Sequence, residues 1–530
     1  MTTLLHQLVA ASAERHGGRP AVTDGSRTVT YAELAAGVGA TAAGLAAAGM
    51  RRSTRVAVFL PKSLETVEAF FAAAMGGGIF VPVNPLLKAR QVAYILQDSG
   101  AELLVTSADR LLALAGELGD CPDLRTIVTV DAPPATVLPG LRVVSLAALQ
   151  AEAPALAAPC IVDEDVVSIF YTSGSTGRPK GVVLSHRNMV AGAHSVASYL
   201  ENHPGDSVLA VLPFSFDYGF SQLTTCFHAG ARVVLLNYLL PKDVLRAAER
   251  EHVTGLAGVP PLWIQLAALE WPAAVQENLR YITNSGGKMP LATLQKLRQR
   301  LPRTRVYLMY GLTEAFRSTY LPPELAEQRP TSIGKAIPNA EILVVRPDGS
   351  ECGPDEPGEL VHRGALVAKG YWRDPERTAE RFRPAPGQLP GVPLQEMAVW
   401  SGDTVQRDAE GFLYFVGRFD EMIKTSGYRV SPTEVEEALY ATQMVCGAVA
   451  FGLAHETLGQ SVAVVVEASE GQAPDTERLL AECRRSLPPF MVPAAVVWET
   501  DLPRNPNGKL DRSGIIGRLR PQLEGARGPG

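Results

Sequence analysis

The sequence predicts an α/β protein in which a large N-terminal domain, with layered α/β subdomains and a β-rich subdomain, precedes a small α+β domain. Three observations support this fold class. The chain has 530 residues, which is too long for one compact core. Short apolar runs alternate with helical patterns over the first four hundred residues, as in layered folds with mostly parallel sheets. From about Gly358 the pattern changes to strands separated by glycine and proline, and after Asp420 to a compact α+β segment.

Hydrophobic periodicity predicts the elements in order. A first amphipathic helix carries Leu4, Leu5, Leu8 and Val9 at helical spacing. Buried strands are expected at Arg55–Leu60, Ala101–Thr106, Thr126–Val130, Asp206–Leu212 and Ala231–Leu236, and helices at Ser63–Ala74, Ala89–Gln97, Lys242–Glu251 and Pro290–Arg300. The last segment is expected to contain helix Ser431–Tyr440, strands Cys446–Gly452 and Ser461–Glu467, and helix Asp475–Ser486. We place the domain boundary at Phe419–Glu421, which gives domains at residues 1–419 and 420–530.

Composition and charge exclude several classes of protein. Lys plus Arg is 49 and Asp plus Glu is 55, so the formal charge is −6. This balance does not favour a nucleic-acid or membrane-surface binder. The six cysteines lie far apart without a CxxC or Cys/His pair, so neither a zinc site nor a disulfide framework is expected. The most apolar stretch, Phe70–Val83, is shorter than a membrane span and contains three glycines. We expect a cytoplasmic monomer or homodimer with reduced thiols.

The most informative segment is Tyr171–His186, YTSGSTGRPKGVVLSH, which overlaps the end of a predicted strand at Val166–Tyr171. It combines three glycines, four hydroxyl residues before Gly177, and Lys180. Glycines let the backbone aim N–H groups at an anion, hydroxyls add donors, and a lysine adds charge. The segment is not a Walker A loop, and no GxGxxG opens a helix here. We interpret it as a cradle for a polyphosphate.

This loop and five further motifs, in the same order, resemble the adenylate-forming superfamily of acyl-CoA synthetases, peptide-synthetase adenylation domains and luciferases. The further motifs are YGLTEA (Tyr310–Ala315), GELVHRGALVAKGYW (Gly358–Trp372), SGD (Ser401–Asp403), GRFDEMIKTSGYR (Gly417–Arg429) and NPNGKL (Asn505–Leu510). The resemblance implies an AMP-forming acid–thiol ligase. Such an enzyme joins a carboxylate to AMP from ATP, with loss of pyrophosphate, and then transfers the acyl group to a thiol. The implied cofactors are ATP and Mg²⁺, with CoA or a phosphopantetheinyl carrier protein as co-substrate.

The resemblance also implies a role for each residue of the ATP site. The β- and γ-phosphates would be held by Thr172, Ser173, Gly174, Ser175, Thr176, Gly177 and Lys180. Adenine would be contacted by Tyr310 and Gly311 and by the edge formed from Gly286, Gly287 and Lys288. Thr313 would bond to the α-phosphate, Glu314 would ligate Mg²⁺, and Asp403, assisted by Arg418, would accept from the ribose hydroxyls.

The same resemblance implies that the C-terminal domain moves between two half-reactions. Lys509 would reach the substrate carboxylate and the α-phosphate in the first orientation. Asp420 matches the position of the hinge. In the second orientation Gly427, Tyr428 and Arg429 would border a tunnel for a pantetheine thiol. An enzyme that stops at the acyl-adenylate is hardly excluded, although Gly427–Arg429 favours thioester formation.

The substrate pocket is expected to be built from Phe216, Asp217, Tyr218, Ser221, Ile282, Asn284, Met309, Arg317 and Ser318. Asp217 matches the aspartate that binds the α-ammonium in amino-acid adenylation domains, and a buried carboxylate requires a cation. That cation could be a substrate amine, or it could be Arg317. Arg317 could instead bind a second substrate carboxylate or carbonyl. An amino acid or similar small polar acid is therefore the first hypothesis, and a non-aminated short- or medium-chain acid the alternative.

Two longer stretches, Tyr310–Glu324 and Ser401–Tyr440, resemble a narrower group of bacterial acyl-CoA ligases that are associated with exosortase systems. Free-standing amino-acid adenylation enzymes are similar as well. The sequence shows no fused carrier domain, so we expect the acceptor thiol in trans. The basic C-terminal tail suits the phosphates of CoA or, slightly better, an acidic carrier protein.

Overall fold

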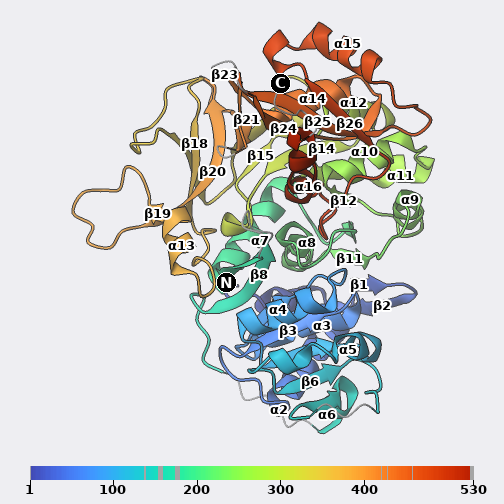
Figure 1. The fold of residues 1–530 in the computed structure, drawn as a ribbon. Helices are drawn as coiled ribbons and strands as arrows, with labels where there is room; N and C mark the ends of the chain where they lie inside the picture. Colours follow the sequence, from blue (N-terminus) through green and yellow to red (C-terminus); the bar gives the residue numbers. More distant parts are fainter. Residues whose placement is uncertain are drawn as a thin grey trace.

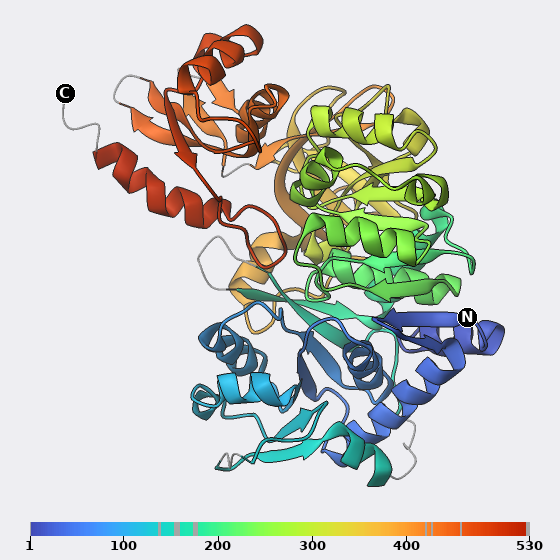
Figure 2. The ribbon, with the colours of Figure 1, turned by 90° about the vertical axis from the view of Figure 1, so that its right-hand side faces the viewer.

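The computed structural model describes residues 2–135, 139–152, 159–172, 179–418, 421–425, 428–455 and 458–525. The structure contains three sheets (Figure 1), and the second of them includes β1 and β2 from the beginning of the chain. The first sheet lies at the bottom of the view, the second forms the centre and the left side, and the third lies at the top with its helices. Figure 2 shows the third unit beside the central sheet, with its last helix projecting toward the chain end. Among the described residues, no helix is both long and apolar enough to cross a bilayer.

The first sheet is parallel except at one edge. Its strands have the order β7-β6-β5-β3-β4-β8-β9, and only the last pair, β8 with β9, is antiparallel. Its strands are β3 (Arg55–Phe59), β4 (Ile79–Pro82), β5 (Leu103–Thr106), β6 (Thr126–Thr129), β7 (Arg142–Ser145), β8 (Val166–Thr172) and β9 (Lys180–Ser185). The accompanying helices are α2 (Tyr31–Ala47), α3 (Leu64–Met75), α4 (Ala89–Ser99), α5 (Ala108–Leu114) and α6 (Leu146–Glu152). Thr172 and Lys180 are partners in the β8–β9 ladder, so both ends of the polyphosphate loop are fixed side by side.

The second sheet joins a parallel half to an antiparallel half. Its order is β17-β18-β20-β21-β16-β15-β14-β13-β12-β10-β11-β1-β2, with β19 paired to β20. The parallel strands are β1 (Pro20–Asp24), β10 (Ser207–Ala210), β11 (Arg232–Leu235), β12 (Gly255–Gly258), β13 (Tyr281–Asn284) and β14 (Arg305–Tyr310). The antiparallel strands are β2 (Arg27–Thr30), β15 (Thr319–Leu321), β16 (Ser332–Ala336), β17 (Ala340–Val345), β18 (Gly358–Gly364), β19 (Phe382–Pro384), β20 (Met397–Arg407) and β21 (Leu413–Arg418). The helices are α1 (Gln7–His16), α7 (His186–Leu200), α8 (Asp217–Ala229), α9 (Pro241–Arg250), α10 (Pro260–Ala268), α11 (Ala273–Asn278), α12 (Leu291–Arg300) and α13 (Pro375–Arg381).

The third sheet belongs to the C-terminal unit, by which we mean residues 421–525. Its order is β23-β22-β25-β24, with β26 parallel to β25. Its elements are β22 (Ile423–Thr425), β23 (Tyr428–Val430), α14 (Pro432–Ala441), β24 (Val445–His455), β25 (Gly459–Ala468), α15 (Thr476–Ser486), β26 (Ala495–Glu499) and α16 (Arg512–Gly525). Alternate residues of β25 enter different cores, Val464 and Val466 on one face and Ala463 and Val465 on the other. This period of two is what a strand buried on both faces requires.

The predicted fold class is confirmed, with a layered α/β part, a β-rich part and a small α+β unit. The predicted elements are present, with ends shifted by at most three residues. Phe419 and Asp420 lie outside the described residues, so the boundary at residues 419 and 420 stays a prediction.

Aromatic side chains join the first two sheets around helix α8. The Phe220 ring is 5.2 Å from the Phe80 ring and 5.6 Å from those of Phe70 and Phe170. Phe227, two turns further along α8, lies 5.2 Å from Phe71 of α3. Each buried phenyl ring stabilises the fold by about 2–3 kcal/mol, so the position of α8 is firmly set. The residues at the beginning of α8 therefore have a rigid support.

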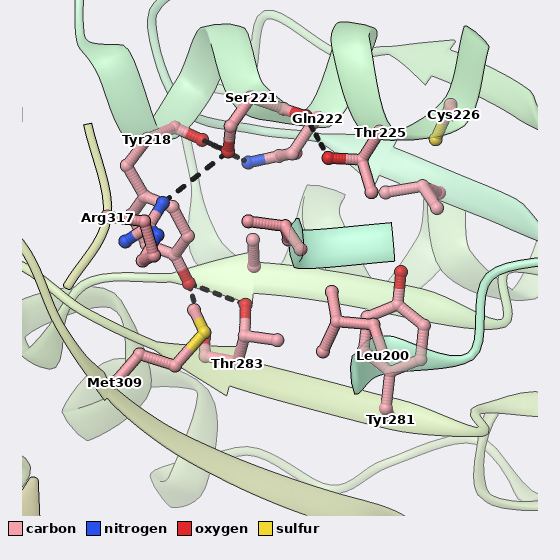
Figure 3. Close-up of a pocket in the computed structure, with 13 residues that line it drawn as sticks. Leu200, Tyr218, Ser221, Gln222, Thr225, Cys226, Tyr281, Thr283, Met309 and Arg317 are labelled. Carbon is pink, nitrogen blue, oxygen red and sulfur yellow. Dashed lines mark hydrogen bonds between the residues drawn. The ribbon is translucent and has the colours of Figure 1, made fainter. Parts of the chain in front are cut away.

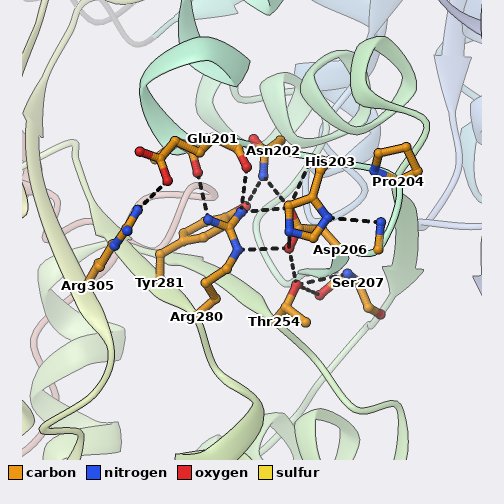
Figure 4. Close-up of polar contacts among 12 residues, drawn as sticks. Glu201, Asn202, His203, Pro204, Asp206, Ser207, Thr254, Arg280, Tyr281 and Arg305 are labelled. Atoms are coloured by element: carbon orange, nitrogen blue, oxygen red, sulfur yellow. Dashed lines mark hydrogen bonds and ion pairs between the residues drawn. The ribbon is translucent and has the colours of Figure 1, made fainter.

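A buried carboxylate ties the amino ends of the parallel strands together (Figure 4). Asp206, just before β10, has no exposed side-chain surface and accepts from Arg280 Nη2 at 2.7 Å and Thr254 Oγ1 at 2.8 Å. Burial raises the pKa of Asp206, but Arg280 and Thr254 outweigh it, so the pKa lies below its usual value. Thr254 and Arg280 precede β12 and β13, so this network aligns three strands. The carboxyl ends of the same strands stay free for a functional site.

Glu68 provides a stability prediction because it packs between α2 and α3 with its carboxyl against the backbone of Gly37. Burial raises its pKa from 4.5 to about 7, and the neighbouring Glu65 adds to the effect. The folded state therefore favours the protonated acid, and stability is lost as pH rises from about 4.5 to 7. We expect Glu68→Gln to raise the free energy of unfolding at pH 8 by about 1–2 kcal/mol and to change it little at pH 4.5. Urea unfolding at both pH values tests this, and an equal effect at the two would contradict it.

Candidate active site

Lys509 lies in a tight turn that inserts toward the large domain. Asn505 shapes this turn, because its Oδ1 accepts from Lys509 N–H at 3.0 Å and its N–H donates to the Lys509 carbonyl at 2.7 Å. Asn84, after β4, donates to the carbonyl of Pro506 at 3.0 Å and holds the turn from the other side. The Lys509 ammonium lies 4.8 Å from the centre of the Phe216 ring. Burial lowers the pKa of Lys509, and the charges of Asp217 and Asp403 oppose that shift.

Asp217 is the first residue of α8 and is 5% exposed. Its Oδ1 accepts from Thr313 Oγ1 at 2.9 Å. Burial raises the pKa of Asp217, while the charges of Arg317 and Lys509 and the Thr313 hydroxyl oppose the rise. Carboxyl-end loops of two strands thus bring Asp217 and Thr313 into contact beside Lys509. The structure brings these three predicted residues together.

Lys180 and Glu314 form an ion pair with Nζ and Oε1 2.9 Å apart. The Tyr371 hydroxyl lies 2.6 Å from both atoms, and Lys180 Nζ is 4.1 Å from the Tyr371 ring centre. Burial raises the pKa of Glu314, but Lys180 and Tyr371 outweigh it, so the pKa lies below its usual value. The predicted phosphate lysine and magnesium ligand therefore neutralise each other in this structure. Tyr371 reaches them because its segment pairs with Val182 of β9.

The predicted adenosine residues lie at the end of β14, within β20 and in the turn after β13. The Tyr310 hydroxyl donates to Asp403 Oδ2 at 2.5 Å, so the two side chains are already in contact. Asn284 at the end of β13 donates to the Gly287 carbonyl at 3.0 Å and shapes the turn that contains Gly286. Lys288 forms an ion pair with Glu437 of α14 at 3.7 Å, so this segment also contacts the C-terminal unit.

A small cavity of about 20 Å³ lies between helices α7 and α8 and strands β10 and β12 to β14 (Figure 3). This is room for one or two water molecules. Its polar side chains face one end, where Arg317 lies over the Tyr218 ring at 4.6 Å. Its other end is closed by Leu200, Cys226 and Tyr281. A space of this size takes at most a small polar group and excludes a long chain.

The cavity receives only part of the predicted pocket. Tyr218, Ser221, Met309 and Arg317 line it as expected. Phe216, Asp217 and Asn284 lie instead beside Lys509 and the Gly286 turn.

Two of the predicted pocket residues, Ile282 and Ser318, do not line this cavity. Ile282 lies between Tyr281 and Thr283, which line the cavity, so strand alternation turns its side chain to the opposite face of β13. Ser318 has its hydroxyl 2.9 Å from Nδ1 of the buried His362, so it forms a hydrogen bond with strand β18 instead. An ion pair between Arg317 and Asp217, one of the alternatives left open, is absent among the described side chains.

Several predicted residues lie beyond what the structure describes. Ser173, Gly174, Ser175, Thr176, Gly177, Asp420 and Gly427 are outside the described residues, and only the backbones of Arg418, Tyr428 and Arg429 are described. Their roles stay predictions.

Sequence reasoning missed Tyr371 and the deeper face of α8. Tyr371 stands inside the GELVHRGALVAKGYW motif, yet nothing local shows that it meets Lys180. Gln222 lies at the end of the predicted pocket segment Phe214–Gln222, whereas Thr225, which also lines the cavity, lies beyond it. Helical spacing could have indicated Thr225, because Tyr218, Ser221, Gln222 and Thr225 share one face of the helix.

Comparison with known proteins identifies the family that the sequence motifs resemble. The model of the family described as AMP-binding enzyme matches residues 9–372. The chain belongs to this adenylate-forming family, and it is an AMP-forming ligase. A second model, the AMP-binding enzyme C-terminal domain, matches residues 434–509 and so includes Lys509.

Three relatives illustrate the range of this family. The 2-succinylbenzoate–CoA ligase of Geobacillus kaustophilus is 32% identical over 96% of both chains. A linear gramicidin synthase of Brevibacillus parabrevis is 30% identical over 96% of this chain, which spans only 6% of that protein. The o-succinylbenzoate CoA synthetase of Bacillus subtilis, solved with its acyl-adenylate intermediate, is 27% identical and superimposes with a TM-score of 0.81 over 98% of this chain and 97% of that one.

Gly286 provides a test of how Lys509 is placed. Its φ is +79°, and a Cβ there would lie 2.6 Å from Lys509 Cε. Gly286→Ala should therefore displace Lys509 and strain the turn. We expect adenylate formation to fall roughly 100-fold, while acyl transfer from a supplied acyl-adenylate changes less than about threefold. Single-turnover assays of both half-reactions measure this, with Gly287→Ala as the neighbouring control. Equal loss in the two half-reactions would contradict the placement.

Proposed function

We propose that this protein adenylates a small polar carboxylic acid, with an amino acid as first candidate, and transfers the acyl group to a phosphopantetheine thiol. The observation that carries the proposal is the position of Lys509. Its ammonium lies against Phe216 and within electrostatic reach of Asp217 and Asp403, at the beginning of the helix that lines the small cavity. A cation fixed there can neutralise the charge that develops between a carboxylate and the α-phosphate.

ATP would enter as its magnesium complex. The described residues contain no group of three or more metal-ligating side chains, so a magnesium ion would depend on phosphate oxygens and water for most of its coordination. Glu314 is suited to be its protein ligand, and Lys180 to receive the phosphates, once the ion pair between them opens. Thr313 would orient the α-phosphate, and Asp403 the ribose.

The small cavity and its polar lining support a compact acid. Asp217 supports an amine on that acid, since its only described hydrogen-bond donor is Thr313. A non-aminated short acid is the second candidate, supported by full-length relatives named as CoA ligases. The arrangement gives little support to a long alkyl chain.

The acceptor would be the thiol of CoA or of a carrier protein. The basic C-terminal segment no longer favours the carrier, because Arg504, Arg512 and Arg518 form ion pairs with Glu467, Glu436 and Glu499 inside the C-terminal unit. CoA and a carrier protein are therefore equally suitable candidates for the acceptor. We retain residues 420–530 as the proposed mobile domain and Asp420 as its proposed hinge.

Substrate-dependent exchange between ATP and labelled pyrophosphate, with magnesium, tests the adenylation half-reaction. Paired panels of amino acids and their deamino counterparts are supplied, followed by CoA or a phosphopantetheinylated carrier. We expect exchange with at least one small polar acid, and a loss of at least about 100-fold in Lys509→Ala. Transfer from a supplied acyl-adenylate should survive in that variant. Exchange that is unchanged in Lys509→Ala would contradict the proposed chemistry.

Asp217→Ala tests the amine-binding role. If the carboxylate binds a substrate ammonium, the variant should lose roughly 30–1,000-fold in kcat/KM for the amine-bearing acid. The deamino counterpart should lose less than about fivefold, because it brings no cation to the site. An equal loss for both acids would remove the ammonium-binding role. Competition by unlabelled amine-bearing acid at fixed ATP gives a second measure of binding.

A further inference from the structure

Arg317 is a buried cation whose described partners include no carboxylate. It is 1% exposed, and its Nη1 donates to Ser285 Oγ at 3.0 Å and its Nη2 to Ser221 Oγ at 3.5 Å. Its Nε, which is also buried, has no hydrogen-bond partner in the described part of the chain. Among the described residues, no aspartate or glutamate lies within ion-pair distance of the guanidinium. Its hydrogen bonds use two of five N–H donors, and both acceptors are neutral hydroxyls.

A second buried side chain of the same cavity also has a polar atom without a hydrogen-bond partner among the described residues. Gln222 is 5% exposed, lines the cavity opposite the sheet, and finds no donor for its Oε1 among the residues that the structure describes. Buried polar atoms in folded proteins are nearly always satisfied, and a buried charge without a counter-charge is costly. Gln222 Oε1 needs a donor such as a water molecule, whereas the unused donors of Arg317 indicate an anionic ligand in this cavity.

The local backbone is built around this arginine. Phe316 has φ +55°, a conformation that is strained for a bulky side chain, and it turns the chain so that Arg317 follows directly. Gly311 leaves room for the arginine, since a Cβ there would lie 3.2 Å from the Arg317 Cα and 3.5 Å from its Cδ. The fold thus holds the guanidinium in one position over the Tyr218 ring (Figure 3).

The reacting carboxylate of the substrate belongs elsewhere, beside Lys509 and Thr313, where AMP is attached. The charge of Arg317 lowers the pKa of both Lys509 and Asp217, so the guanidinium lies near that place without occupying it. A second anionic group, a few bonds away from the reacting carboxylate, could reach Arg317 while the first one meets Lys509. A bidentate carboxylate would use the donors that Ser221 and Ser285 leave free.

We propose that Arg317 recognises a second carboxylate of the substrate, so that the acid is a compact dicarboxylic acid of three to five carbons, with or without an amine. This inference rests on the proposed function and specifies its substrate class. Ser285 and Ser221 orient the guanidinium, and Tyr218 supports it from below. The size of the cavity limits the chain between the two carboxylates.

The test compares acids of equal carbon number that differ in the second carboxylate. The full chain is assayed by pyrophosphate exchange with malonate against propanoate, succinate against butanoate, and aspartate against 2-aminobutanoate. We expect kcat/KM for at least one dicarboxylic acid to exceed that of its partner by roughly 100-fold. In Arg317→Gln the ratio should fall to within about threefold of one. Arg305→Gln, which removes an exposed arginine from the opposite edge of the same sheet, should keep the ratio.

The outcomes separate this inference from the function on which it rests. Exchange with monocarboxylic acids alone, or a ratio that Arg317→Gln leaves unchanged, overturns the recognition of a second carboxylate while adenylation stands. Loss of exchange with every acid in Arg317→Gln would assign the arginine to the reacting carboxylate and overturn the inference. No exchange with any acid in the wild type would contradict both.

A binding measurement provides a readout without turnover. Malonate or succinate at millimolar concentration should raise the melting temperature of the wild type by several degrees and that of Arg317→Met by less than one. Because the guanidinium has no carboxylate partner among the described residues, Arg317→Met itself should melt within about two degrees of the wild type or above it. A fall of more than about five degrees would make Arg317 a structural residue and overturn the proposal.

Discussion

The site depends on a balance of charges that are held close together with little access to water. Lys509, Arg317 and Lys180 supply cations, and Asp217, Asp403 and Glu314 supply anions. Lys180 and Glu314 form a direct pair. Lys509, Arg317 and Asp217 influence one another without an ion pair between any two of them. That arrangement is costly for folding, and it suits an AMP-forming ligase, which brings a carboxylate and the phosphates of ATP into the same space.

The scaffold explains how such a site is tolerated. Phenylalanines around Phe220 pack α8 between two sheets, so the helix that presents Asp217 does not have to be stabilised by the polar site itself. The Asp206 network fixes the amino ends of the same strands. Rigid support at one edge of the sheet lets the other edge keep groups available for a ligand, as is common where loops carry function.

Lys509 belongs to the C-terminal unit, whereas the other charged residues of the site belong to the large domain. Its turn is held by Asn505 and touches the large domain through Asn84, which is a small set of contacts. Under the proposed function, few contacts would have to break for this turn to leave the large domain. Likewise, the Lys180–Glu314 ion pair would have to open before magnesium and phosphate could bind these two side chains. Both are contacts that the proposed reaction would break.

The sequence by itself determined the family and the fold class, and it predicted the residues of the ATP site, because glycine-rich and charged motifs keep their chemistry within a few consecutive residues. It also indicated Asp217 and Arg317, although it left open whether they pair. Tertiary structure decided that question, since whether Arg317 meets Asp217 or Ser285 depends on the turn at Phe316 and the stagger of β13 and β14. The tertiary structure also places Ile282 on the face of β13 away from the cavity. It pairs the Ser318 hydroxyl with His362 and the Tyr371 hydroxyl with Lys180. These contacts join residues far apart in the chain, and local sequence carries no information about which of them will meet.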